Sequence, residues 1–213
     1  MKITIVYDNC PAKAGLMTSW GFAALVETEG AAPLLFDTGA DGATLLYNMK
    51  QLAIDPRGIG VIVISHAHSD HTGGLSDILE INKNAEIYVP GSTVVRLPGR
   101  KVVLVSQPVQ ISEAVFSTGE LQGTEQSLTI KTTKGIVVVA GCSHPGVAEI
   151  LHAASYHGKI CGIIGGLHGF SDFNQLEGLS LICPCHCTEY KLELRRLFPE
   201  QCVQCGAGLE LEL

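Results

Sequence analysis

The sequence predicts an α/β protein with two mixed β-sheets packed face to face and helices on the outside. Short, apolar, strand-like segments dominate the beginning of each half of the chain, and segments with helical spacing follow them. No glycine-rich phosphate-binding turn follows the first strand, which disfavours a doubly wound sheet. We expect a single domain over residues 1–213, with two pseudo-symmetric halves of roughly 1–110 and 111–213.

The pattern of apolar residues predicts the elements of the first half in order. Residues 60–65 form a short apolar run, which is typical of a strand buried on both faces. Residues 43–52 and 75–80 have the spacing of helices. The expected strands of this half, separated by Gly and Pro, are 3–7, 22–27, 34–36, 60–65, 87–89 and 101–105.

Strands and helices alternate more regularly in the second half. Residues 147–157 and 188–197 are expected to be helical, with a shorter helix at 173–178. The expected strands are 114–116, 128–132, 135–140, 160–164, 179–183 and 209–213. This order agrees with two mixed sheets that carry their helices on the outer faces.

Composition excludes several classes of protein. Hydrophobic residues make up 46% of the chain and charged residues 16%, so the chain can bury a sizeable core and is neither disordered nor a coiled coil. The net charge is −7 and the basic residues are scattered singly, so we expect no nucleic-acid partner. No apolar run approaches the roughly 20 residues that span a bilayer, and the amino terminus lacks the pattern of a signal peptide. We therefore expect no membrane partner and a cytoplasmic location.

The eight cysteines are too few for a disulfide scaffold in a chain of this length. In a reducing compartment we expect them to be thiols, metal ligands or small core residues. One alternative is a separate zinc site made of Cys183, Cys185, Cys187, Cys202 and Cys205. We favour core packing for Cys183, Cys161 and some of the later cysteines.

The strongest chemical signal lies directly after the buried run at 60–65. His66, His68, Asp70 and His71 place three imidazoles and one carboxylate within six residues. Imidazole nitrogen and carboxylate oxygen are ligands of zinc and related divalent metals. In a loop that leaves a strand, the first two histidines can converge on one ion while Asp70 and His71 turn towards a second. The alternative is a solvated polar loop that happens to contain histidine.

The same arrangement recurs at the ends of three later strands, where a residue able to bind metal follows an apolar run. Four separate strands therefore deliver such residues at the same kind of position, which favours one shared site over isolated polar residues. The later candidates are Cys142 and His144, then His168, and then Cys183, Cys185, His186 and Cys187.

His66, His68, Asp70 and His71 match the H-x-H-x-D-H marker of the metallo-β-lactamase superfamily, and the chain resembles that superfamily over nearly its whole length. The resemblance implies a four-layer αβ/βα sandwich. Phe36-Asp37-Thr38-Gly39 matches the acidic marker of the superfamily, which implies that Asp37 is a buried group orienting the ligand loop. The alternative for Asp37 is a turn or a helix cap.

Further motifs resemble one branch of the superfamily, the 7,8-dihydropterin-6-methyl-4-(β-D-ribofuranosyl)aminobenzene-5'-phosphate synthase family. The matching segments are Trp20-Gly21-Phe22-Ala23-Ala24-Leu25-Val26-Glu27, Glu125-Gln126-Ser127-Leu128, Gly141-Cys142-Ser143-His144-Pro145-Gly146, Gly165-Gly166-Leu167-His168 and Pro184-Cys185-His186-Cys187-Thr188.

The chain departs from the superfamily pattern at two ligand positions. Most members place a metal-binding histidine where residues 116–120 contain none, so His144 is the expected substitute and Glu120 a weaker candidate. Cys142 stands where the superfamily usually has a bridging aspartate. It is expected to bridge two ions, to bind one ion, or to be a small buried residue. His186 is expected to be the last ligand, and His168 remains for substrate or metal.

The resemblance implies a metal-dependent hydrolase that uses a metal-activated water on a small substrate, with phosphorylated compounds among the candidates. We assign His66, His68 and His144 to one divalent ion. Asp70, His71 and His186 hold the other, and Cys142 lies between or beside them. Zinc is the first choice, with manganese or iron as alternatives.

Asp70 and His168 are the expected catalytic residues, because Asp70 can take the proton released during turnover and His168 can donate one to the leaving group or bind an anion. The loop at 8–19, with Trp20 beside it, is a candidate mouth of the pocket; its alternative is a surface loop anchored by Trp20. The alternative functions are a synthase-like transferase, a non-catalytic metal or redox sensor, and a di-iron redox protein with a flavin partner.

Overall fold

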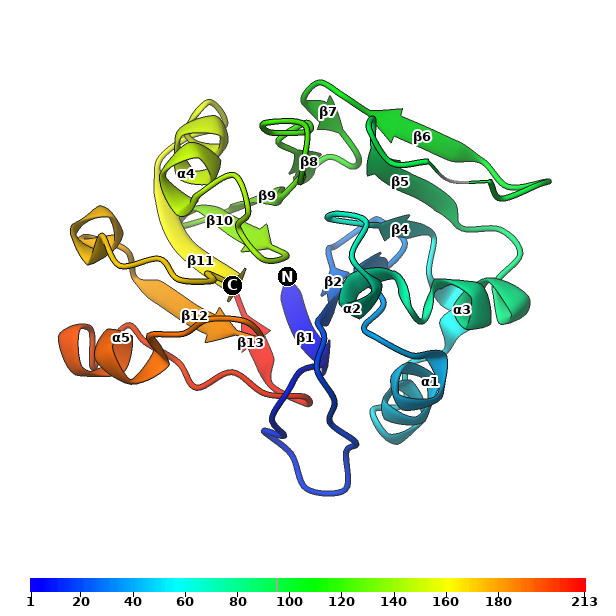
Figure 1. The fold of residues 1–213 in the computed structure, drawn as a ribbon, viewed down its shortest axis with the longest axis horizontal. Helices are drawn as coiled ribbons and strands as arrows, with labels where there is room; N and C mark the ends of the chain where they lie inside the picture. The colour runs from blue at the N-terminus through cyan, green and yellow to red at the C-terminus, as the bar shows by residue number, and fades with distance from the viewer. Residues whose placement is uncertain (95) are drawn as a thin grey trace.

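The computed structural model describes residues 1–94 and 96–213 and shows two β-sheets facing each other, with helices on both outer sides (Figure 1). The first sheet has the strand order β13-β1-β2-β3-β4-β5-β6. Its strands are β1 (Lys2–Tyr7), β2 (Ala23–Glu27), β3 (Leu34–Phe36), β4 (Val61–Val63), β5 (Glu86–Pro90), β6 (Val102–Val105) and β13 (Glu210–Glu212).

The second sheet has the strand order β12-β11-β10-β9-β8-β7. Its strands are β7 (Val109–Gln110), β8 (Val115–Ser117), β9 (Leu128–Thr132), β10 (Gly135–Ala140), β11 (Ile160–Gly166) and β12 (Leu181–Cys185). The neighbours β10, β11 and β12 are parallel, as are β3, β4, β5 and β6 in the first sheet. Parallel strands end at the same edge, so each sheet gathers several carboxyl ends on one side.

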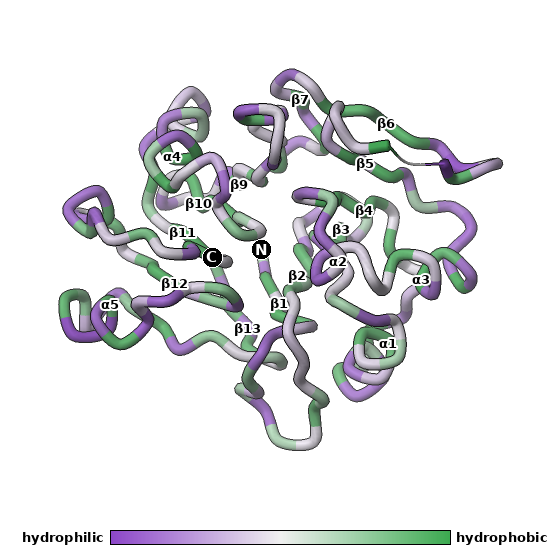
Figure 2. The backbone as a smooth tube through the Cα atoms, in the orientation of Figure 1, coloured by the Kyte–Doolittle hydropathy of each residue, from purple (hydrophilic) through white to green (hydrophobic). Residues whose placement is uncertain are grey.

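In the described part of the chain, four helices cover the outer faces of the sheets, and a short fifth helix lies at one end of the sandwich, in the loop after β4. They are α1 (Gly42–Gln51), α2 (Ser69–Thr72), α3 (Leu75–Ile81), α4 (Val147–Ser155) and α5 (Lys191–Leu197), with short 3₁₀ turns η1 (Pro56–Gly58) and η2 (Phe173–Leu176). Hydrophobic colour follows the strands in Figure 2, whereas the outer helices carry both colours. Among the residues that the structure describes, no helix has the length and apolar character that crossing a bilayer requires.

Three apolar cores separate the four layers. The first lies between the sheets, the second between the first sheet and α1 and α3, and the third between the second sheet and α4 and α5. Strand β10 shows the alternation that builds them: Val137 and Val139 face the central core, whereas Ile136 and Val138 face the outer one. The predicted sandwich of two mixed sheets with outer helices is confirmed.

Several element predictions need correction. The strand predicted at 179–183 runs from Leu181 to Cys185, because β12 is an edge strand and tolerates Pro184, which has no N–H to donate. The helix predicted at 173–178 is the shorter 3₁₀ turn η2. The two-residue strand β7, the helix α2 and the turn η1 were not predicted at all, since pieces this short carry almost no periodicity.

The cysteines of the last third lie mainly in the central core. Cys183 is buried there as predicted. Cys185 and Cys205 also lie in this core, as expected for some of the later cysteines, but they form a disulfide, which was not predicted. The sulfur atoms of Cys183, Cys185 and Cys205 lie within 4.8 Å of one another. Cys187 turns away from them towards Cys142, so the five cysteines do not form the alternative zinc site.

Candidate metal centre

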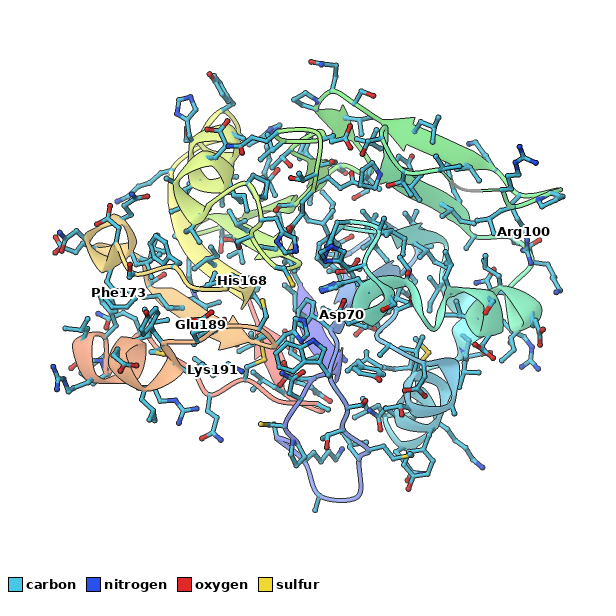
Figure 3. All side chains as sticks on the ribbon, in the orientation of Figure 1. Asp70, Arg100, His168, Phe173, Glu189 and Lys191 are labelled. Carbon is cyan, nitrogen blue, oxygen red and sulfur yellow. A yellow bond between two sulfur atoms is a disulfide. The ribbon has the colours of Figure 1, made fainter. Side chains whose placement is uncertain are left out.

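The candidate residues meet at one end of the sandwich, where strands from both sheets end. Figure 3 labels two of the candidates, Asp70 from the first half of the chain and His168 from the second. The loop after β4 carries His66, His68, Asp70 and His71, and α2 begins within it. Cys142 and His144 follow β10, and His186 follows β12. Segments far apart in the sequence therefore supply one cluster.

One part of the cluster consists of His66, His68 and His144. His66 Nε2 lies 3.0 Å from His68 Nδ1 and 3.2 Å from His144 Nε2. His66 Nδ1 is 2.8 Å from Ser65 Oγ, which itself donates to Asp37 Oδ2 at 2.7 Å. Ser65 is therefore left to accept the proton of His66 Nδ1, and His66 Nε2 presents a lone pair to the other two rings.

Burial and the neighbouring histidines favour the neutral form of His66 and of His144. They lower the pKa of His66 to about 2, and burial together with His68 also lowers the pKa of His144. Neutral imidazole is the form that binds a metal ion. Ring nitrogens of His68 and His144 both lie within 3.2 Å of His66 Nε2, and imidazole nitrogens are ligands of divalent cations.

A second part of the cluster, here called the Asp70 group, consists of Asp70, His71, Cys142 and His186. Its four ligand atoms all lie within 4.8 Å of one another. Asp70 Oδ2 is 3.2 Å from His186 Nε2, and His71 Nε2 is 3.1 Å from Cys142 Sγ. Burial and the charge of His71 lower the pKa of His186 to about 4, so this ring too is neutral near pH 7.

Cys142 belongs to both parts, because its sulfur also lies within 4.8 Å of the ligand atoms of His66 and His144. Here we call His66, Cys142 and His144, with His68 beside them, the His66 group. The hydrogen bond with Cys187 and burial raise the pKa of the Cys142 thiol. A thiolate at this position therefore requires a nearby cation, which deprotonates a coordinating thiol.

Two polar residues outside the cluster fix the orientation of its rings. Asp37 Oδ2 lies 2.7 Å from His71 Nδ1. Burial opposes the charged form of His71, but Asp37 together with the carboxylates of Asp70 and Glu125 outweighs it and raises the pKa of His71. Asn9 Oδ1 lies 3.0 Å from His186 Nδ1, and Asn9 Nδ2 donates to His186 O. With Nδ1 engaged in these bonds, His71 and His186 each present Nε2 to the other members of the Asp70 group. Metal-binding histidines usually have their second ring nitrogen hydrogen-bonded in this way. The sequence pointed to Asp37 but not to Asn9.

Glu125 is a second residue whose role the sequence did not predict, although its segment resembles the synthase branch. Its side chain is fully buried, and its two carboxylate oxygens accept four backbone N–H bonds, from Gly141, Cys142, Ser143 and His144. Burial pushes the pKa of Glu125 upward, while those N–H groups oppose the rise. Glu125 therefore holds the turn that presents Cys142 and His144.

Four non-glycine residues at this end of the sandwich have left-handed backbones. The φ angles are 60° at Asp37, 61° at Ser143, 46° at His168 and 43° at His186. Such conformations cost roughly 1–3 kcal/mol each and persist where the surrounding structure imposes them. Their gathering at one end of the molecule is typical of a functional site.

Two candidates lie outside both groups. His168 stands at the rim, with its ring centre 5.4 Å from that of His144 and its Nδ1 3.8 Å from Glu189 Oε1. Together with His144 and Phe170 it lines a cavity of about 310 Å³ beside the cluster. Glu120 accepts hydrogen bonds from Ser92 and belongs to neither ligand group, so the structure does not support it as the replacement ligand.

Fold and site together define an αβ/βα sandwich with a cluster of histidines, a carboxylate and a thiol at one end. A model of the metallo-beta-lactamase superfamily matches residues 21–166. The chain belongs to the metallo-β-lactamase superfamily.

Individual relatives show which members of the superfamily the chain is similar to. A 7,8-dihydropterin-6-methyl-4-(beta-D-ribofuranosyl)-aminobenzene-5'-phosphate synthase from Methanocaldococcus jannaschii is 27% identical over 259 aligned positions, covering 89% of this chain and 88% of that protein. The crystal structure of Tm1679, a metal-dependent hydrolase of the beta-lactamase superfamily, has a TM-score of 0.79 at 28% identity and covers 100% of this chain and 99% of that chain. YhfI from Bacillus subtilis, at 17% identity, shares the fold with a TM-score of 0.69 and covers 100% of this chain and 98% of that one. The predicted resemblance to the synthase branch is confirmed.

Proposed function

We propose that the chain is a metal-dependent hydrolase with two divalent ions, one in the His66 group and one in the Asp70 group. The observation that carries this proposal is the position of Cys142, whose sulfur lies within 4.8 Å of ligand atoms in both groups. A shared ligand brings two cations close enough to act on one substrate. Zinc is the preferred ion, because imidazole and thiolate suit it.

Divalent ions in these groups would supply Lewis acidity and a hydroxide nucleophile near neutral pH. The chain's own residues do the rest. Asp70, one fifth exposed, can take up the proton released during turnover. His168 lies at the rim of the cavity and can donate a proton to a leaving group or hold an anionic part of the substrate.

The cavity of about 310 Å³ supports a small substrate, which we propose as the partner of the site. A synthase-like transferase acting on a phosphorylated compound is the second candidate function, supported by the 27% identity with the dihydropterin-ribofuranosylaminobenzene phosphate synthase. A cytoplasmic location remains part of the proposal.

The test is metal analysis of the purified protein together with His68→Ala and Cys142→Ala, and activity assays on phosphodiester, lactone and thioester probes. We expect about two ions per chain in the wild type, less metal in both variants, and activity that depends on metal. Metal-dependent activity retained by His68→Ala would contradict the hydrolase proposal. Unchanged metal content in Cys142→Ala would contradict only the role of the thiolate.

A further inference from the structure

Trp20, the only tryptophan of the chain, lies against the Asp70 group although it is 59% exposed. Its indole Nε1 donates a hydrogen bond to Asp70 Oδ2 at 3.0 Å. Its ring centre lies 4.8 Å from that of His186. One side chain from the loop between β1 and β2 therefore contacts two members of the group.

The backbone after Trp20 is bonded to Asp70 directly and to His186 through Asn9. Gly21 N–H donates to Asn9 Oδ1, the atom that also lies 3.0 Å from His186 Nδ1. Phe22 N–H donates to Asp70 O. A Cβ atom on Gly21 would lie 2.7 Å from Asp70 O, so the chain can pass this close only because residue 21 is glycine. Trp20 and Asp70 are therefore joined by the bond between their side chains and by the neighbouring backbone.

The oxygen that accepts from Trp20 is the one that faces the centre of the group. Asp70 Oδ2 lies 3.2 Å from His186 Nε2 and 3.9 Å from His71 Nε2. A donor outside the ligands that bonds to a ligating carboxylate sets its orientation and tunes its affinity for metal. The His66 group has no such contact with Trp20 among the hydrogen bonds of the described residues.

We propose that Trp20 is a positioning residue that orients the Asp70 carboxylate through its indole N–H and thereby controls the affinity of the Asp70 group, and not of the His66 group, for a divalent ion. This inference rests on the proposed metal centre. It assigns to the loop between β1 and β2 a selective effect on one of two sites.

The test is titration of metal-free protein with Zn²⁺ against a competing chelator. Trp20→Phe keeps an aromatic ring and removes the N–H donor. We make it in the wild type, in His68→Ala, where the His66 group is impaired, and in His186→Ala, where the Asp70 group is impaired. The matched control is Tyr156→Phe, which removes one polar group from an aromatic residue that is 80% exposed on another part of the surface.

In the wild type and in His68→Ala, Trp20→Phe is expected to lower the affinity for one Zn²⁺ ion about 10-fold, within the range usual for residues that hydrogen-bond to metal ligands. In His186→Ala it should change nothing, and Tyr156→Phe should be neutral throughout. In protein that keeps Trp20, its fluorescence should change on Zn²⁺ binding in His68→Ala but not in His186→Ala. Circular dichroism checks that the variants are folded.

Three outcomes overturn the inference. Wild-type affinity for both ions in Trp20→Phe shows that the N–H bond is unimportant. An equal loss of affinity for both ions shows that Trp20 has a general structural role. A wild-type chain that binds no Zn²⁺ removes the inference together with the proposed function, whereas the first two outcomes leave the proposed function intact.

Discussion

Glu125 illustrates how much of the centre depends on a residue that cannot itself be a ligand. Its carboxylate is enclosed, and both oxygens face backbone N–H groups of the turn after β10. Hydrogen bonds to a charged group contribute about 1.5–3 kcal/mol each, and a buried donor left without an acceptor costs about 1–3 kcal/mol. The turn that carries Cys142 and His144 therefore depends on this one side chain.

We predict that Glu125→Gln lowers the free energy of unfolding by about 2–3 kcal/mol, because the amide has one acceptor oxygen where the carboxylate has two. Chemical denaturation measures the change, and Zn²⁺ titration should show weaker binding in the same variant. Glu149→Gln, an exposed change on α4, serves as the control. An unchanged midpoint in Glu125→Gln would exclude the anchoring role.

Glu125 stands in a segment that resembles the synthase branch, but no sequence motif gave it a role. The residues before β9 are polar, which is typical of a surface loop, yet Glu125, Gln126 and Ser127 are all fully buried. Gln126 Nε2 donates to Ile64 O, which joins this segment to the end of β4. Only the packing of the second sheet against the first makes such a polar stretch internal.

At the scale of elements, helix α1 follows the Asp37 turn and begins at a well-formed cap. Asp41 Oδ1 accepts from Thr44 N–H at 2.7 Å, and Asp41 Oδ2 accepts from Tyr7 OH at 2.8 Å. Burial opposes ionisation, but these donors outweigh it and lower the pKa of Asp41. A lowered carboxyl pKa stabilises the fold above the unfolded value of about 3.9, and that stability is lost as pH falls through the folded value.

We predict that Asp41→Ala lowers the free energy of unfolding by about 1 kcal/mol at pH 7, as is usual for loss of an N-cap. The difference from the wild type should shrink as the pH falls below about 4, because the wild-type carboxylate is then protonated. Denaturation at several pH values measures this. Asp41→Asn keeps a capping oxygen without a charge, so the stability that it provides should not be lost at low pH. A stability difference between the wild type and Asp41→Ala that stays constant down to low pH would refute the argument.

The elements also show where sequence patterns lose information. β3, β9 and β10 have the predicted bounds, because Gly, Pro and strand-forming residues mark them clearly. Helix α2 spans Ser69–Thr72, inside the ligand motif, and was not predicted. Four residues are too few for a stable isolated helix, so tertiary bonds such as Gly73 N–H to Gly39 O hold this segment.

At the scale of the molecule, the candidate ligands come from both sheets. His66 to His71 follow β4 of the first sheet, and Cys142 and His186 follow strands of the second. The last strand, β13, returns to pair with β1, so both chain ends lie in the first sheet, side by side (Figure 1). We propose that residues 1–213 form a single domain, in which bound ions would link the two sheets.

Removal of metal should therefore lower the stability of the whole chain. A ligand present at 100 times its Kd stabilises the folded state by about 2.7 kcal/mol. We expect one unfolding transition by circular dichroism and by Trp20 fluorescence, with a lower midpoint after EDTA and recovery on addition of Zn²⁺. His68→Ala should respond less. Separate transitions would argue against a single domain, and a midpoint indifferent to EDTA would argue against linking ions.

The sequence by itself determined the class of the fold and the superfamily and pointed to the candidate ligands, because apolar periodicity and the H-x-H-x-D-H spacing are local properties of the chain. It also pointed to Asp37 through a local motif. The resemblance led us to expect His144 beside His66, whereas tertiary structure alone decided that Glu120 joins neither ligand group. Tertiary structure also brought Asn9, Trp20 and Glu125 to the centre and paired Cys185 with Cys205. These contacts join residues far apart in sequence, so they exist only once two sheets have packed with a particular register and their strand ends meet.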